Sequence, residues 1–357
     1  MMRFLARHRR IINVIVIIAF IAGFVYFTIK TRDIKIGTYD SKTYSGIAFN
    51  TAIKKTIFMN DVDRRDQIDA EIDKTLREID EKLSYRNEDS EVAFFNRNYA
   101  TGGIYNFDPE IISYLKKEME ICKETDGAFC PCILPLTRLW GIEDGNNKVP
   151  SDKDIKDRLA RIDYKEMEVT DEGLTLNAGN MAIDFGASGK GIAADKVYKV
   201  LSDNDVPGAI ISIGGTILTY GSKGADDIWR VGIQDPRGAT GDAIGAIEVG
   251  GGTFISTSGD YEKFFEVDGK RYHHILDPKT GYPADNGLIS VTIATDNGLT
   301  SDAMSTACFV MGLEDGMRYA ESKGADAVFV TSDKKIHLSK GLKKRFIIKA
   351  NDYEIAK

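Results

Sequence analysis

The chain is poor in cysteine and histidine, with four of each among its 357 residues. Cys130 and Cys132 flank a single proline, and no second Cys/His pair completes a zinc set with them. Cys122 falls on the apolar face of a predicted helix and is expected to be a core residue. This scarcity argues against a domain built around zinc or disulfides.

The sequence also lacks a basic stripe. Lys and Arg number 47 against 54 Asp and Glu, which gives a net charge of -7. The basic residues are spread among the acids, and the one clear basic cluster lies at the N-terminus. Because nucleic-acid binding requires concentrated positive charge, this composition excludes a nucleic acid as partner.

The N-terminus combines that basic cluster with an apolar run. Residues 11–29 carry no charge, and nineteen residues at ~1.5 Å each can cross a hydrocarbon core of roughly 30 Å. We therefore expect a single-pass anchor over residues 1–30 and a tether over 31–43. The positive-inside rule then places the remaining domain outside the cell membrane. The alternative is a cleaved signal peptide, but the run ends without an Ala-x-Ala site.

Residues 44–357 read as one globular domain with mixed elements. Apolar residues at helical spacing predict an amphipathic helix over 65–83, and Asp108-Pro109 predicts the start of another. Residues 208–215 read as a buried strand, and residues 245–277 read as successive strands separated by glycine turns. This mixture, with many hairpins late in the chain, predicts an α+β fold.

A glycine-rich loop follows an expected strand that ends at Asp184. Gly186, Gly189 and Gly191 surround Lys190, and a helix is expected to begin there. Backbone N–H groups, a helix N-terminus and a lysine together suit a phosphate. The spacing is not that of a Walker loop. The alternative is a tight turn without a ligand.

Two further stretches are short and polar. In "SIGGT", residues 212–216, glycines after a strand allow a flat ligand to approach the backbone, although a bulge fits equally well. In "TSDAMST", residues 300–306, Asp302 and Thr306 are four apart on one helix face. A carboxylate and a hydroxyl so placed can hold Mg²⁺, whereas the alternative is a helix cap.

Half of the chain's histidines stand side by side in "RYHHILDPKTGYPA", residues 271–284. Neighbours on a strand point to opposite faces, so only one of the two can face a cleft. His274 is a candidate general base, with an ordinary pKa near ~6.5, and His273 would then be structural. The alternative for His274 is a strand-end histidine bonded to the turn.

These stretches, in this order, resemble the ApbE family of FAD:protein FMN transferases. The resemblance rests on "IDFGASGKGIAADK", "SIGG", "TSGDYEKFFEVDGKRYHHILDPKTGYPA" and "SDAMSTA", and earlier on "SEVAFFN", "GAF" and "LWG". It implies an α+β fold with FAD in a cleft between two lobes. It also implies Mg²⁺-dependent transfer of FMN from FAD to a threonine hydroxyl of another protein, with release of AMP.

The resemblance also implies roles for single residues. The family's FAD-contacting positions fall on Phe49, Ala128, Phe129, Asp184, Lys190 and Ile275, with Tyr85 as a stacking residue. Its metal positions fall on the carbonyl of Ala187 and on the side chains of Asp302 and Thr306. The catalytic residues are expected to be His274 and, through the metal, Asp302.

The chain departs from the family's pattern in three places. Phe49-Asn50-Thr51 stands where the family often has Met-Gly-Thr or Met-Asp-Thr. "GAFDPT" becomes "GAFCPC", which removes a carboxylate and a hydroxyl from the expected flavin or adenine contacts. The expected aromatic residue falls at Tyr85, one place early, with Arg86 in the matching column.

Two other functions fit the same residues. A Mg²⁺-dependent FAD pyrophosphatase would split FAD into FMN and AMP with water as the acceptor. A flavin-binding protein without catalysis would leave FAD intact. For a transferase anchored outside the membrane, the expected acceptors are membrane electron-transfer subunits that carry a modifiable threonine.

Overall fold

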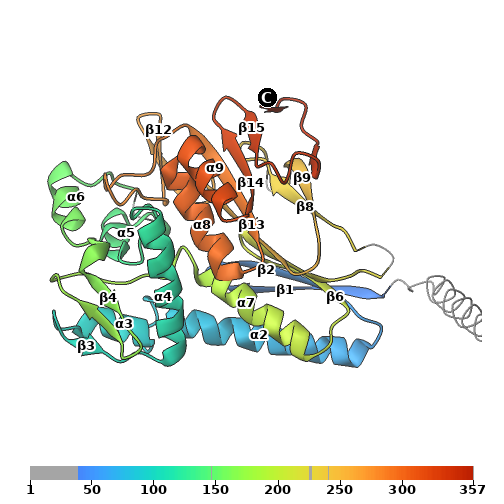
Figure 1. Ribbon diagram of the computed structural model, residues 1–357, viewed down its shortest axis with the longest axis horizontal. Helices are drawn as coiled ribbons and strands as arrows, with labels where there is room; N and C mark the ends of the chain where they lie inside the picture. The colour runs from blue at the N-terminus through green and yellow to red at the C-terminus, as the bar shows by residue number, and fades with distance from the viewer. Residues whose placement is uncertain (1–38, 146, 225–226, 240, 357) are drawn as a thin grey trace, which may run out of the picture.

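The computed structural model describes residues 39–145, 147–224, 227–239 and 241–356 (Figure 1). The anchor predicted over residues 1–30 lies outside the described residues. Strand β1 begins at Ser41, inside the segment assigned to the tether. Within the described part of the chain, no helix is both long enough and apolar enough to cross a bilayer.

The helices are gathered on one side and at one end of the molecule. They are α2 (Val62–Leu83), α3 (Glu91–Asn98), α4 (Pro109–Glu124), α5 (Leu134–Trp140), α6 (Asp152–Leu159), α7 (Gly189–Asp203), α8 (Gly298–Met311) and α9 (Leu313–Ser322). Short 3-10 turns cover Ile142–Asp144 and Tyr164–Glu166.

The strands form one large sheet and three small ones. They are β1 (Ser41–Ala48), β2 (Thr51–Phe58), β3 (Ile104–Tyr105), β4 (Met167–Val169), β5 (Leu174–Leu176), β6 (Gly208–Ile213), β7 (Thr216–Gly221), β8 (Trp229–Gln234), β9 (Ala243–Val249), β10 (Thr253–Gly259), β11 (Phe264–Val267), β12 (Lys270–His273), β13 (Leu288–Thr295), β14 (Asp326–Thr331), β15 (Lys335–Leu338), β16 (Phe346–Ile348) and β17 (Glu354–Ile355).

Within the described residues the large sheet has the order β1-β2-β6-β7-β10-β13-β14-β15-β17. Its neighbouring strands run antiparallel except for β15 and β17, which run parallel. The small sheets are β16-β9-β8, β11-β12 and β3-β5-β4. The predicted α+β class with mixed and antiparallel sheets is therefore confirmed.

Alternating side chains give the large sheet two buried faces. On β14, Ala327 and Phe329 pack with α8 and α9, while Val328 and Val330 face the opposite core. That second core is closed by β8 and β9, with Trp229 among its buried residues. Helices α2, α7, α8 and α9 thus cover one face, and the sheet β16-β9-β8 covers the other (Figure 1).

Helix α2 confirms the predicted amphipathic helix. Ile68, Ile72 and Leu76 are buried on one face, and Asp61 caps the helix by accepting a hydrogen bond from the backbone N–H of Arg64. Lys55 of β2 is fully buried against this helix, where its Nζ lies 2.6 Å from Asp69 Oδ1 and also bonds Asp73. These two carboxylates compensate the charge of the buried Lys55 ammonium group, which would otherwise be costly to bury.

Other local predictions are confirmed with one correction. Asp108 accepts a hydrogen bond from the N–H of Glu110 at the start of α4, as its N-cap position predicts. The segment before Asp184, however, is not a strand. The Asn96 side chain bonds both the N–H and the C=O of Ile183 at 2.9 Å, so a side chain replaces a neighbouring strand.

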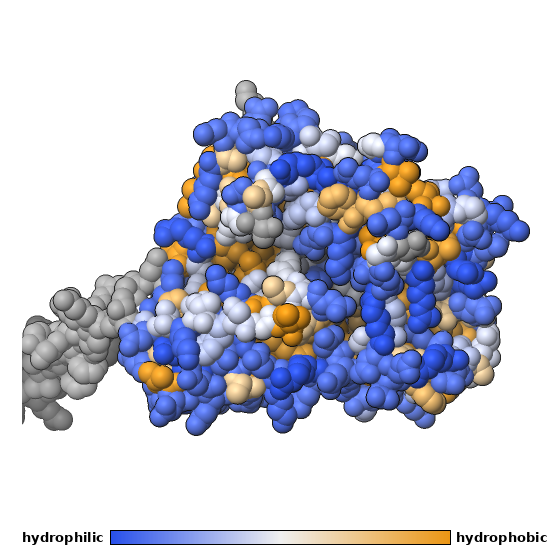
Figure 2. All heavy atoms as spheres, turned by 180° about the vertical axis from the view of Figure 1, so that it is seen from behind, coloured by the Kyte–Doolittle hydropathy of each residue, from blue (hydrophilic) through white to orange (hydrophobic). Residues whose placement is uncertain are grey.

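The back of the molecule carries a mostly polar surface. Figure 2 shows apolar residues in small separate patches there, with a hollow near the middle of the face. Scattered apolar residues of this kind are ordinary on a folded protein. The pockets that bear on function are identified by the residues that line them.

Candidate active site

Two adjoining pockets form one cleft, and every residue predicted for the site lines it. The pockets share Tyr85, Arg86, Glu143, Asp184, Gly186, Lys190, Glu262 and His274. Phe49 lines the first pocket, and Ala128, Phe129, Ala187, Ile275, Asp302 and Thr306 line the second. The structure therefore brings together segments that lie more than two hundred and fifty residues apart in the sequence, from Phe49 to Thr306.

The close approach of two helix N-termini builds the centre of the cleft. A Cβ on Gly191 would lie 2.1 Å from the carbonyl oxygen of Gly298, and a Cβ on Gly298 would lie 2.2 Å from that of Gly191. Only glycine allows this contact between α7 and α8. It sets Lys190, at the start of α7, beside Asp302 in α8.

Helix α8 is fixed in this position by Asp195 of α7. The Asp195 carboxylate accepts hydrogen bonds from the N–H groups of Gly298 and Leu299, at 2.7 and 2.9 Å. Asn297 caps the same helix by accepting from the N–H of Thr300 at 2.9 Å. Asp302 is therefore not the N-cap of α8, so the helix-cap alternative that the sequence left open for it is wrong.

Asp302 is a buried carboxylate at the floor of the cleft. Its Oδ2 accepts a hydrogen bond from the Gly191 N–H at 3.0 Å and lies 3.8 Å from Lys190 Nζ. Its Oδ1 accepts from Thr216 Oγ1 at 3.4 Å. Burial raises the pKa of Asp302, and the Lys190 charge opposes this shift. The Asp302 charge in turn raises the pKa of Lys190.

The residues predicted to bind a metal offer oxygen ligands, the type that a hard cation prefers. Asp302, Thr306 and Ala187 line the same pocket, and they offer a carboxylate, a hydroxyl and a carbonyl oxygen. Thr306 Oγ1 lies 3.3 Å from Ser258 Oγ, so another hydroxyl is close. Mg²⁺ takes one or two protein carboxylates and completes its shell with water and phosphate. Among the described residues, no group of three or more His, Cys, Asp or Glu offers a metal site of another kind.

The two histidines have different surroundings, as predicted, although strand β12 ends at His273 and His274 lies just beyond it. His273 is buried, with Nε2 3.0 Å from the Ala284 carbonyl oxygen and Nδ1 accepting from the Ile275 N–H at 3.3 Å. His274 lines both pockets, and its Nδ1 lies 3.2 Å from the Lys263 carbonyl oxygen. Its Nε2 is thereby left for a ligand in the cleft.

The pKa of His274 differs from the ordinary value expected from the sequence. Burial lowers it to about 4, against the effect of Glu143, whose charge raises it. Lys263 and Lys190 add to the lowering. The imidazole is therefore neutral at neutral pH, which is the form able to accept a proton.

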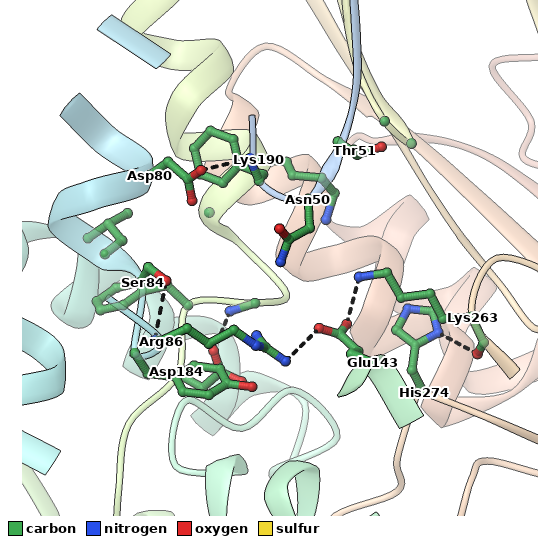
Figure 3. Close-up of a pocket in the computed structure, with 18 of the residues that line it drawn as sticks. Asn50, Thr51, Asp80, Ser84, Arg86, Glu143, Asp184, Lys190, Lys263 and His274 are labelled. Carbon is green, nitrogen blue, oxygen red and sulfur yellow. Dashed lines mark hydrogen bonds and ion pairs between the residues drawn. The ribbon is translucent and has the colours of Figure 1, made fainter. Parts of the chain in front are cut away.

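An ion-pair chain crosses the cleft beside His274 (Figure 3). Glu143 lies 3.2 Å from Arg86 and 3.0 Å from Lys263, measured between charged nitrogen and oxygen atoms. Burial opposes ionisation of Glu143, yet Lys263, His274 and Arg86 together keep its pKa below the ordinary value. Figure 3 shows Asp80, Ser84 and Arg86 on one side of the pocket and Lys263 and His274 on the other.

A two-residue hairpin turn presents Phe49 to the cleft. Phe49 and Asn50 both have φ of 52°, and Ala48 pairs with Thr51 across the turn. A type I′ turn requires positive φ at both central residues. Asp80 secures it by accepting the Phe49 N–H at 2.8 Å. This geometry explains why a residue such as Asn, Asp or Gly suits position 50.

Tyr85 has a hydroxyl group that points to a ligand. The hydroxyl is buried and finds no hydrogen-bond partner among the described residues. Its ring is covered by the guanidinium groups of Arg86 and Arg138, at 4.4 and 5.4 Å from the ring centroid. Because buried polar groups normally have partners, this hydroxyl suits a polar group of a ligand in the cleft.

The departure at Cys130 and Cys132 lies in the wall of the second pocket. Cys130 lines that pocket, and the carbonyl oxygen of Pro131 accepts the Asp184 N–H at 2.8 Å. Burial raises the pKa of Asp184 to about 6, although the Gly186 N–H bonds its Oδ1 at 2.8 Å. This wall therefore links the cysteine segment to the glycine loop.

Several cleft residues carried no assigned role in the sequence. Glu262 belongs to the "TSGDYE" segment that supports the family resemblance, but nothing in the sequence predicted a role for this residue itself. Burial raises its pKa, Lys190 lowers it, and Asp302 raises it further. Arg86, Glu143 and Lys263 come from three separate segments, so only the folded chain shows that they form one network.

Comparisons with known proteins show which family the chain resembles. A family model described as the ApbE family matches residues 46–329. The chain is 32% identical over 284 residues to the FAD:protein FMN transferase of Treponema pallidum (strain Nichols), covering 75% of this chain and 78% of that protein. It is 37% identical over 233 residues to the enzyme of the same name from Klebsiella pneumoniae (strain 342), covering 64% and 72%.

Solved structures show the same architecture. The ApbE protein of Thermotoga maritima superposes with a TM-score of 0.77 at 32% identity, over 85% of this chain and 98% of that one. The flavinyl transferase ApbE of Pseudomonas stutzeri, in its apo form, gives a TM-score of 0.72 at 28% identity, over 88% and 95%.

Proposed function

The chain belongs to the ApbE family, and on that premise we propose that it transfers the FMN part of FAD to a threonine hydroxyl of an acceptor protein and releases AMP. It is thus an FAD:protein FMN transferase. The observation that carries this proposal is the single cleft in which Lys190, Asp302 and His274 meet the residues predicted for FAD.

Binding and orientation of FAD fall to the two walls of the cleft. Phe49 offers an apolar surface at one end, and Ala128, Phe129 and Ile275 offer one at the other. Lys190 and the amides at the start of α7 lie between these ends, which is where the diphosphate of FAD belongs. Fixed positive groups at this place hold the phosphates and oppose charge on the leaving AMP.

His274 is placed to receive the proton of the attacking hydroxyl. Its Nδ1 is oriented by the Lys263 carbonyl, so Nε2 is the atom that accepts the proton. The threonine oxygen forms a bond to the FMN-side phosphorus, and the bond from this phosphorus to the AMP oxygen breaks. Reactions of this kind depend chiefly on positioning and charge neutralisation.

Asp302, Thr306 and the carbonyl of Ala187 would hold Mg²⁺. When bound, the ion would neutralise charge on the diphosphate. Asp302 is held for this task by the Gly191 N–H and Thr216, and Lys190 supplies a second positive charge 3.8 Å away.

A groove next to the cleft suits entry of the acceptor. It is lined by Gly232, Gln234 and Arg271, and it meets the cleft at Glu262 and Lys263. Among the described residues, none predicted to hold FAD lines this groove. A protein segment lying there would bring its hydroxyl toward the phosphates without displacing FAD.

Anchoring to the cell membrane is part of the same proposal. The uncharged run over residues 11–29, preceded by arginines, has the composition of a single-pass anchor. The domain then faces the outside of the membrane, and its acceptors are membrane electron-transfer subunits.

The proposal is tested by weighing a protein whose flavin-accepting threonine is known after incubation with this enzyme, FAD and Mg²⁺. We expect the acceptor to gain the mass of one FMN unit and one AMP to appear for each unit gained. The acceptor's Thr→Ala variant and a reaction with EDTA serve as controls. FMN and AMP in solution with an unmodified acceptor would instead identify a pyrophosphatase, and intact FAD would identify a binding protein.

A further inference from the structure

Three of the chain's thiols gather at the wall of the FAD cleft. The Sγ atoms of Cys130 and Cys132 lie 3.2 Å apart, and the buried Cys122 of α4 influences the pKa of Cys130. All of them are free thiols, as is Cys308 in α8. The family's aspartate and threonine positions in "GAFDPT" are occupied here by Cys130 and Cys132, so this cluster is a feature of the present chain.

The thiols differ in their relation to the cleft. Both are buried, but Cys130 lines the second pocket and Cys132 does not. Interaction with Cys122 and Cys132 lowers the pKa of the Cys130 thiol, while the pKa values of Cys122 and Cys132 are raised, so Cys130 ionises first. A thiolate that lines a pocket is the form that reacts with a disulfide entering that pocket.

We propose that Cys130 and Cys132 form a reversible dithiol–disulfide site in the wall of the FAD cleft, oxidised by small disulfides that enter the cleft. The two sulfur atoms are separated by 3.2 Å and need to approach to the ~2.05 Å of a disulfide bond. The site rests on the proposed function only in that the cleft is taken to bind FAD.

The exchange proceeds in two balanced steps. The Cys130 thiolate attacks one sulfur of the small disulfide, which forms a mixed disulfide and releases one thiolate. Cys132, on losing its proton, then attacks the Cys130 sulfur and releases the second thiolate. Two electrons and two protons pass from the cysteine pair to the small disulfide, which leaves as two thiols.

Oxidation is coupled to FAD binding through the surrounding backbone. Ala128 and Phe129, both predicted to contact FAD, directly precede Cys130. The Pro131 carbonyl between the two cysteines accepts the Asp184 N–H at 2.8 Å. Closing the pair by about 1 Å shifts this wall, and shifts of that size in a binding site are costly. We expect FAD to bind ~10-fold more weakly to the oxidised protein.

The test treats the reduced full chain with 2-hydroxyethyl disulfide and then blocks free thiols in denaturant with N-ethylmaleimide. Peptide mass mapping is expected to show a Cys130–Cys132 link, with Cys122 and Cys308 alkylated. FAD affinity, measured by flavin fluorescence, is expected to fall ~10-fold and to recover with dithiothreitol. Saturation with FAD beforehand is expected to slow the reaction, because FAD covers Cys130.

Two variants serve as matched controls. Cys132→Ser keeps the thiol that lines the pocket but cannot close the pair, so it is expected to stop at the mixed disulfide. Cys308→Ser removes a buried cysteine from α8 and is expected to respond like the original chain. Four alkylated cysteines after treatment, a link that uses Cys122, or an unchanged FAD affinity in the linked protein would each overturn the proposal. A reduced protein that binds no FAD would instead contradict the proposed function, and the peptide map would still decide whether the pair forms.

Discussion

His274 lies among groups that act on it in opposite directions. Burial and the charges of Lys263 and Lys190 favour its neutral form, while Glu143 favours the protonated one. The sequence predicted that the two neighbouring histidines have different surroundings, which the structure shows, although β12 ends at His273 and His274 lies just beyond it. The value of the His274 pKa depends on residues from three other segments, and no local pattern could predict that.

Replacing His274 with alanine separates binding from chemistry. In the proposed mechanism the ring accepts the hydroxyl proton and is not among the groups that hold the phosphates. His274→Ala is therefore expected to keep FAD affinity within about threefold and to lose at least ~100-fold in transfer rate. His337→Ala, a change on the distant strand β15, is the matched control. FAD titration and single-turnover transfer measure the two effects, and near-normal transfer by His274→Ala would remove its catalytic role.

The lowered pKa of His274 also predicts how transfer depends on pH. The base must be unprotonated, so kcat/KM for FAD is expected to fall as pH drops through about 4, the pKa in the free enzyme. Bound diphosphate adds negative charge beside the ring and raises this pKa, so kcat is expected to fall at a higher pH than kcat/KM. Steady-state rates, with the fold checked by fluorescence at each pH, provide the test. Coincident acid limbs would contradict the proximity of His274 to the diphosphate.

At the scale of elements, the contact between α7 and α8 decides the geometry of the site. The glycines of the "GASGKG" loop were read from the sequence as a phosphate site or a tight turn, and not as a contact between helices. Their partner could not be predicted, because Gly298 lies more than a hundred residues away and belongs to no motif of its own. The helices, hairpins and caps were predictable from local periodicity, whereas the segment before Asp184 was misread because Asn96 supplies its hydrogen bonds.

A single methyl group at this contact tests its importance. In Gly191→Ala the new Cβ would lie 2.1 Å from the Gly298 carbonyl oxygen, so α7 and α8 must separate. We expect a loss of ~1–3 kcal/mol in the free energy of unfolding and weaker FAD binding. Gly250→Ala, whose Cβ would meet no atom within 4 Å, is expected to stay within ~0.5 kcal/mol. Urea unfolding measures both, and equal stabilities would show that the helices do not need this contact.

For the whole molecule, the large sheet holds segments from both ends of the chain around one cleft. The order of its strands places β2 beside β6 and β7 beside β10, which brings the Phe49 turn, the "SIGG" turn and the "TSGDYE" segment to one region. Such long-range pairing is not encoded in any short window of sequence. That these segments meet in one cleft was predictable only because the ordered set of motifs resembles a known family.

The proposed anchor gives a prediction at this scale. A chain without residues 1–38 is expected to be recovered without detergent and to keep its transfer rate within about twofold on a soluble acceptor, since the cleft begins at Phe49. The full chain is expected to sediment with membranes and to be cleaved by protease added outside the cell. Recovery of the full chain, with its N-terminus intact, in the soluble fraction would contradict the anchor.

The most direct test of the site is a crystal structure of the protein with FAD and Mn²⁺ in place of Mg²⁺, in which anomalous scattering locates the metal. We expect the metal on Asp302, Thr306 and the Ala187 carbonyl, against the diphosphate of FAD, with His274 across from the FMN-side phosphorus. A diphosphate bound away from Lys190 and His274, or a metal that leaves Asp302 uncoordinated, would contradict the transferase site described for this cleft.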